Sequence, residues 1–263
     1  MSGRFGTGVK GFSILELVVA LAIFLIICGV AFEMLLSAMR RYHDDSQLLN
    51  SFQEARFGLD QMVRDVNDAG FPPRNQYEAG TTPAVNLYAS TPFAWSSGSG
   101  YPNTACTIGT NCDPPGDYDL IVETDIDPQN INGVEWVRYQ LNGTTLYRGV
   151  VSKGNSDPDS TTSAALVPYI QNVVNNPPAP QLAALRAVYP AMYPSGPVPI
   201  FTYVCASTPY PDDCKKVSTA THDPPHVVGV IITLIVQAPT TELQTGKPRL
   251  VQLKGEGRRI NPD

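Results

Sequence analysis

Residues 11–32 read GFSILELVVALAIFLIICGVAF, and one side chain in this run, Glu16, is charged at neutral pH. The 21 residues from Phe12 to Phe32 are enough to cross a bilayer, because a membrane-spanning helix needs about 20 apolar residues. The ten preceding residues are polar and glycine-rich, and they include Arg4 and Lys10. An ordinary secretory signal has its small cleavage-site residue after the apolar run. Here the candidate site precedes the run, which predicts a removed leader (1–11) and a retained transmembrane helix (12–32).

Glu16 is the residue that a plain membrane anchor does not explain, since a carboxylate inside hydrocarbon is unfavourable by about 3 kcal/mol or more. Cleavage after Gly11 would create an α-ammonium group on Phe12, at the positive end of its own helix, which is also unfavourable when left alone. We therefore predict a charge pair between the Phe12 amine and Glu16 of the same or a neighbouring helix. Arg4 and Lys10 predict that residues 33–263 lie outside the cytoplasm.

Two other interpretations of this segment remain open. One is a simple signal anchor with an incidental glutamate. The other is a lipoprotein signal ending at Cys28, within Leu25-Ile26-Ile27-Cys28-Gly29. The residue before a lipoprotein cysteine should be small, whereas here it is Ile27. We therefore interpret Cys28 as a buried residue of the helix.

The helix is predicted to continue beyond the membrane. Between Phe12 and Asp68 there is no proline, and the only glycines are Gly29 and Gly58, as a long helix requires. After Phe32 the apolar residues recur at steps of three and four, which predicts an amphipathic continuation over residues 33–70. Ala69-Gly70 followed by Phe71-Pro72-Pro73 predicts that the helix ends near Asp68.

Residues 71–263 should form a β-rich head outside the cytoplasm. All 24 prolines and two thirds of the 21 glycines lie after residue 70, which is typical of strands joined by turns and long loops. Strands are predicted at 119–124, 134–141, 144–150, 198–205, 227–236 and 249–254, with a further one near 84–89. The uniformly apolar 227–236 should be a central strand buried on both sides. The predicted fold class is α+β, a long N-terminal helix packed on an antiparallel β-sheet with long loops.

The dipeptide Asn142-Gly143 predicts a hairpin between the second and third of these strands. A two-residue turn at this position puts Tyr139 opposite Leu146 on one face. On the other face it puts Arg138 opposite Tyr147, as a cation-aromatic pair.

Four of the five cysteines fall into two close pairs, Cys106/Cys112 and Cys205/Cys214, in turn-rich stretches. We predict two small disulfide loops, which indicate an oxidising, exported environment. Zinc is the alternative, but spacings of five and eight intervening residues do not match the short knuckles of structural zinc sites.

Two groups of polar residues were considered as metal sites. The stretch 222–226 reads HDPPH beside Asp212 and Asp213, but its prolines prevent the helical spacing that would align the two imidazoles. Asp125, Asp127, Asn130 and Asn132 resemble calcium ligands, but their offsets miss the helix-loop-helix pattern. We expect no metal and no other cofactor.

Composition and motifs narrow the classes of function. The formal net charge is −6 and 16% of the 263 residues are charged, so the basic surface of a nucleic-acid-binding protein is missing. The sequence contains no glycine-rich phosphate loop, serine elbow or Cys/His nucleophile motif. We expect neither catalysis nor nucleic-acid binding.

The segment Gly11-Phe12-Ser13-Ile14-Leu15-Glu16-Leu17 resembles the prepilin leader site of type IV pilins and type II secretion pseudopilins. The resemblance implies that a prepilin peptidase cleaves between Gly11 and Phe12 and methylates the new amine. It also implies that Glu16 pairs with the amine of an adjacent subunit during assembly.

The layout of the chain is similar, in outline, to PilW-type minor pilins and J-class pseudopilins. The similarity comprises the long helix, NDAGFPP at 67–73, EWVRYQLNGTTLYR at 135–148, the late apolar strand and the basic Arg258-Arg259. It implies a low-copy subunit that helps to initiate a filament or to form its tip. Residues 151–197 and 205–226 have no counterpart in this resemblance.

The same resemblance implies the location and the partners of the chain. The subunit would lie in the bacterial inner membrane with its head in the periplasm, and then in a filament in the periplasm or at the cell surface. Its partners would be membrane lipid, other pilin or pseudopilin subunits, prepilin peptidase and an inner-membrane assembly platform.

The alternative function is a tip-located adhesin or ligand-binding module. The resemblance does not distinguish a type IV pilus from a secretion pseudopilus or a DNA-uptake filament.

Overall fold

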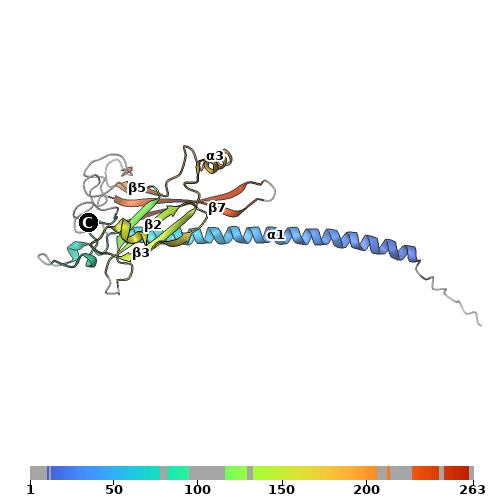
Figure 1. Cartoon of the computed structure of the whole chain (residues 1–263), viewed down its shortest axis with the longest axis horizontal. Coiled ribbons are helices and arrows are strands. Elements are labelled where there is room, and N and C mark those ends of the chain that lie inside the picture. Colours follow the sequence, from blue (N-terminus) through green and yellow to red (C-terminus); the bar gives the residue numbers. More distant parts are fainter. Residues whose placement is uncertain are drawn as a thin grey trace, which may run out of the picture. The chain divides into compact units, whose positions relative to one another are not determined.

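The computed structural model describes residues 11, 13–77, 82–94, 116–128, 133–205, 212–213, 227–242 and 246–260, with the backbone alone at 212–213. The chain divides into two compact units, residues 1–47 and 48–263, and each is described by itself. The elements shown in Figure 1 are α1 (Ile14–Asn67), η1 (Arg74–Gln76), η2 (Val85–Leu87), β1 (Asp119–Thr124), β2 (Glu135–Asn142), β3 (Thr145–Ser152), α2 (Pro158–Ser163), β4 (Val167–Ile170), α3 (Ala179–Val188), β5 (Phe201–Cys205), β6 (Asp212–Asp213), β7 (Val227–Thr241) and β8 (Pro248–Arg258). The described residues therefore have an α+β fold, as predicted.

Helix α1 has 54 residues and ends at Asn67, within one residue of the predicted end. In the second unit, one stripe of its surface is buried, at spacings of three and four residues that keep the stripe on one face. The buried residues of α1 are Ala55, Gly58, Leu59, Met62, Asp65 and Val66. This face joins residues of both sheets in one hydrophobic core, so the last part of α1 belongs structurally to the head.

The strands form two antiparallel four-stranded sheets, in the orders β1-β2-β3-β4 and β6-β5-β7-β8. The prediction of a single sheet was therefore too simple. Strand β7 lies between β5 and β8 and is buried along most of its length, which confirms the predicted central strand. Val173 forms an isolated bridge with Val236, so the chain that leaves β4 pairs directly with β7.

The predicted register of the β2–β3 hairpin was wrong by two residues, because the turn lies one residue later than predicted. Tyr139 is paired with Arg148, and Arg138 with Gly149. An Asn142-Gly143 type I′ turn needs a positive φ at both residues, but among the described non-glycine residues only Asn172 has one. Gly143, with φ +60°, instead takes the first central position of the turn, as in a type II′ turn.

Leu250 and Leu253 of strand β8 contact two different apolar clusters. Leu253 packs against the main core, which contains α1, whereas Leu250 packs against a second cluster, which includes Leu185 of α3 and Tyr193. The strand thus contacts apolar groups on both faces. Glycine permits the closest of these contacts, because a Cβ at Gly257 would lie 2.6 Å from the Cβ of Val66 on α1.

Other predictions of local structure were wrong. The segment near 84–89 is not a strand but contains the 3-10 turn η2. Its Asn86 carbonyl accepts a hydrogen bond from the Val134 N–H, and Ala89 makes only an isolated bridge with Pro73. Strand β5 begins at Phe201 instead of residue 198, because the Val198 N–H donates to the Asn175 carbonyl outside either sheet. Helices α2 and α3 and strand β4 were not predicted.

Candidate functional site

The predicted processing and assembly residues are Gly11, Phe12 and Glu16, and Glu16 lies in the first turn of α1. Gly11 is exposed, and Phe12 lies outside the described residues. The Ser13 N–H donates to Oε2 of Glu16 over 3.0 Å, while the Leu15 N–H donates to Oγ of Ser13 over 3.3 Å. The Leu17 N–H donates to the Ser13 carbonyl over 3.1 Å. This reciprocal arrangement is a capping box, in which side chains satisfy the N–H groups that a helix start leaves without partners.

The capping box gives Glu16 a partner within its own chain. Oε2 is engaged by Ser13, while Oε1 accepts no hydrogen bond from the residues that the structure describes. Since Phe12 lies outside those residues, the charge pair between Phe12 and Glu16 stays a prediction. The pattern Ser-x-x-Glu at the helix start is the local sequence signal for this cap.

The first unit presents an apolar surface. An 18-residue window of α1 has a mean hydropathy of 2.9 and no buried residue, and among the described residues α1 is the one helix long and apolar enough to span a membrane. Thirteen large apolar side chains between residues 12 and 32 are each at least 50% exposed: Ile14, Leu15, Leu17, Val18, Val19, Leu21, Ile23, Phe24, Leu25, Ile26, Ile27, Val30 and Phe32. An apolar surface of this size marks a membrane or protein contact.

The cysteines are described in part. Cys205 is disulfide-bonded, and Cys28 is a free thiol at a half-exposed position on α1. Cys106, Cys112 and Cys214 lie outside the described residues. The two predicted pairs therefore remain predictions.

Asp65 links α1 to the first sheet. It is 3% exposed and accepts hydrogen bonds from Gln61 (2.7 Å), from the Tyr139 hydroxyl (2.5 Å) and from Arg148 (3.1 Å). Burial, and then the charge of Asp65, raise the pKa of Tyr139 far above its ordinary value, so the hydroxyl stays a neutral donor. This network fixes one position of α1 against β2 and β3.

Arginine contacts in the first sheet also differ from the prediction. The cation-aromatic contact is made by Arg148, whose guanidinium carbon lies 5.7 Å from the centre of the Tyr139 ring. Arg138 instead binds Asp119 through two nitrogens, at 2.9 and 2.5 Å, and it also pairs with Asp159 of α2. Arg138 therefore ties α2 to the sheet.

A second buried ion pair joins Lys153 to Glu123, and both side chains are 0% exposed. The Lys153 ammonium donates to Glu123 Oε2 (3.0 Å), to the Tyr88 carbonyl (2.9 Å) and to Ser90 Oγ (2.7 Å). Burial lowers the pKa of Lys153, against the charge of Glu123. The pair anchors the segment around residue 90 to the first sheet, and three acceptors for three ammonium hydrogens indicate a structural role.

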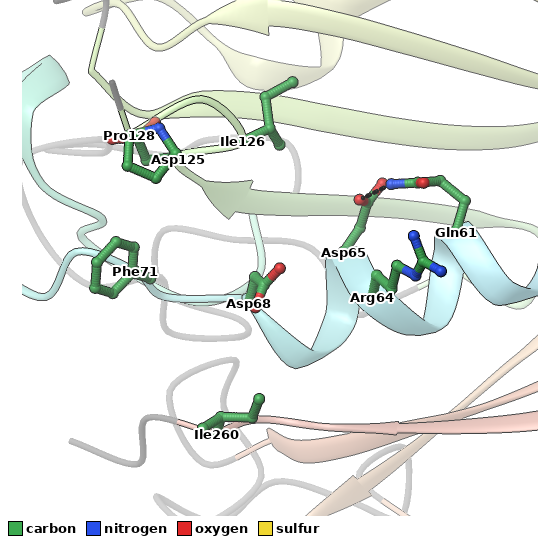
Figure 2. Close-up of a pocket in the computed structure, with 9 residues that line it drawn as sticks. All are labelled: Gln61, Arg64, Asp65, Asp68, Phe71, Asp125, Ile126, Pro128 and Ile260. Carbon is green, nitrogen blue, oxygen red and sulfur yellow. Dashed lines mark hydrogen bonds between the residues drawn. The ribbon is translucent and has the colours of Figure 1, made fainter. Parts of the chain in front are cut away.

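A pocket of about 420 Å³ lies at the end of α1 (Figure 2). Its lining residues are Gln61, Arg64, Asp65, Asp68, Phe71, Asp125, Ile126, Pro128 and Ile260. Burial raises the pKa of Asp68, and the charge of Asp65 adds to this. Burial also raises the pKa of Asp125. The lining offers carboxylates beside apolar side chains but no thiol or imidazole.

The described residues contain no group of three or more His, Cys, Asp or Glu side chains that could hold a metal ion. Of the residues compared with calcium ligands, Asp125 and Asp127 are described. Asp125 Oδ1 accepts the Asp127 N–H over 3.1 Å, which closes a local turn. Asn130 and Asn132, and the histidines of 222–226, lie outside the described part of the chain.

Replacing Glu135 by glutamine is expected to stabilise the head at neutral pH. Burial raises the pKa of this carboxyl, the Ile126 N–H opposes the shift, and the charges of Asp125 and Asp127 add to it. A raised carboxyl pKa gives stability that is complete below the ordinary value of about 4.5 and is lost as the pH rises through the folded-state value. Glutamine keeps an acceptor for Ile126 without the charge. Thermal unfolding of the full-length chain in detergent should show Glu135→Gln more stable than wild type at neutral pH and equal to it at a pH below the ordinary carboxyl pKa.

The matched control is Glu256→Gln, at an exposed position of β8, which should change stability little at either pH. Equal stability of Glu135→Gln and wild type at both pH values would show that burial of the Glu135 charge does not destabilise the head.

Together these observations define an α+β fold with a long apolar helix near the N-terminus. No protein-family model matches the chain, and searches of curated proteins and of solved structures also found no match.

Proposed function

We propose that this chain is a subunit of a type IV pilin-like filament, cleaved after Gly11 and N-methylated at Phe12. Before assembly, residues 12–32 hold it in the bacterial inner membrane with its head in the periplasm. The observation that supports the proposal best is the start of α1, where Glu16 of the GFSILEL motif (residues 11–17) lies in the first turn of an exposed apolar helix. In a secretory signal this carboxylate would have no role. In a helix that packs against identical or similar helices, it can form an ion pair with a positively charged group of a neighbour.

The two parts of α1 have separate tasks in this proposal. In the membrane, lipid covers the exposed apolar side chains. In a filament, neighbouring helices replace the lipid, and the α-ammonium group of an adjacent subunit meets Glu16. The last part of α1 contributes to the core of the head.

The size of the head favours a minor subunit over the repeated shaft subunit. More than 180 residues follow Asn67, and they include two sheets and two further helices. In the proposal the chain is a low-copy pilin or pseudopilin that helps to start the filament or lies near its tip, below a subunit that lacks the glutamate. Its partners are other pilin-like subunits, prepilin peptidase and the assembly platform.

Fractionation of the native host tests this function. Filaments are sheared from cells or released from the periplasm, and peptides of this chain are quantified by mass spectrometry in the filament and membrane fractions. We expect the chain in the filament fraction at low copy, and its loss from that fraction when prepilin peptidase is deleted. A chain that stays in the membrane fraction while other subunits form filaments would refute the proposal.

A further inference from the structure

We propose that Ser13 is a positioning residue for assembly, whose backbone N–H fixes one oxygen of the Glu16 carboxylate and leaves the other for the ammonium group of a neighbouring subunit. This inference rests on the proposed function, which supplies that ammonium group by cleavage after Gly11. The inference adds Ser13 to the pairing site as a residue that acts by positioning the Glu16 carboxylate.

The geometry of the capping box carries the inference. Ser13 N–H engages Oε2 of Glu16 at 3.0 Å, and Oε1 has no donor among the described residues. Ser13, which directly precedes α1, and Glu16 in its first turn are both exposed, so a second helix can approach Oε1. One carboxylate can accept a hydrogen bond at each oxygen. An ammonium group can therefore bind Oε1 without breaking the hydrogen bond between the Ser13 N–H and Oε2.

Holding Glu16 in place beforehand has a physical consequence. A glutamate side chain loses rotamer freedom when it is fixed, and this loss opposes pairing if it occurs at the moment of contact. In the capping box the side chain is already ordered. The positive end of the helix dipole also attracts a negatively charged group at this position.

Substitutions at residue 13 separate the N–H from the hydroxyl. Ser13→Pro removes the donor to Glu16, Ser13→Ala keeps that donor and removes the hydroxyl, and Ser13→Thr keeps both. With cleavage after Gly11 verified for each, we expect Ser13→Thr and Ser13→Ala to enter filaments within about twofold of wild type. Ser13→Pro should fall by about tenfold, as for a lost hydrogen bond to a charged group.

A double-mutant cycle distinguishes positioning from simple helix stability. Glu16→Gln keeps the capping acceptor, because glutamine serves in a capping box, but removes the charge. If Ser13 acts through the Glu16 charge, Ser13→Pro should lower incorporation much less in the Glu16→Gln background than in wild type. An equal loss in both backgrounds, or normal incorporation of Ser13→Pro, would overturn the inference and leave the proposed function intact.

Hydrogen exchange of the Ser13 amide, in the cleaved full-length chain in detergent, provides a test that does not depend on processing of the proline variant. Wild type and Glu16→Gln should protect this amide, and Glu16→Ala should expose it. Equal exchange in all three would refute the capping bond. Absence of the wild-type chain from filaments is a different result, which would refute the proposed function itself.

Discussion

Glu16→Gln should be cleaved after Gly11 like the wild-type chain and yet enter filaments at less than about one tenth of the wild-type level. Glutamine can accept the Ser13 N–H, so the start of α1 stays capped. It cannot neutralise the α-ammonium group of a neighbouring subunit, and a charge left without its partner in apolar surroundings is disfavoured by about 2–5 kcal/mol.

The measurement is the ratio of this chain in the filament and membrane fractions, with the mature N-terminus checked for each variant. The matched control is Glu33→Gln, which removes the same charge from the same helix just outside the predicted membrane segment, and which should incorporate normally. Normal incorporation of Glu16→Gln would show that the charge at this position has no part in assembly.

The second large effect is expected at the buried pair of Lys153 and Glu123. Lys153→Met leaves the Glu123 carboxylate buried at 0% exposure without its cation. Removing one partner of a buried ion pair is destabilising by about 3–5 kcal/mol. We expect the head of Lys153→Met to be largely unfolded at a denaturant concentration at which the wild type is folded.

Pulse proteolysis of the full-length chain in detergent measures this loss. Adding Glu123→Gln to Lys153→Met should recover much of the stability, because glutamine is neutral and can still accept the Ser90 N–H. Lys254→Met, at an exposed position of β8, is the control and should change little. A Lys153→Met chain as stable as wild type would contradict the structural role of the pair.

The parts of the fold that could be predicted have strong local signals. Helix α1 is defined by a long run without proline and by the Gly-Phe-Pro-Pro stop, and strand β1 has the predicted bounds. The apolar run at 227–236 identified the central strand β7. In each case the residues that determine the structure are adjacent in the sequence.

The rest depends on contacts that a single sequence does not reveal. Asp65 and Tyr139 are 74 residues apart, and no local pattern joins them. Helix α2 has six residues, too few for apolar residues to recur over several turns, and it is tied to the sheet by Arg138. The hairpin register depended on which central position of the turn Gly143 occupies. The dipeptide Asn-Gly favours glycine at the second central position, whereas Gly143 occupies the first.

At the candidate site, the sequence indicated Gly11, Phe12 and Glu16, but the interpretation considered charge alone. Ser13 was missed although Ser-x-x-Glu is a local pattern. The buried charges Glu123 and Lys153 were also missed, because each stands in a strand or just after one and looks like an ordinary surface residue.

The mature N-terminus tests the central claim most directly. The chain is purified from membranes of its native host, and its N-terminal peptide is identified by mass spectrometry. We predict a start at Phe12 with a methylated amine. An intact Met1, a lipid-modified start at Cys28, or a start after the apolar run beyond Phe32 would contradict the account.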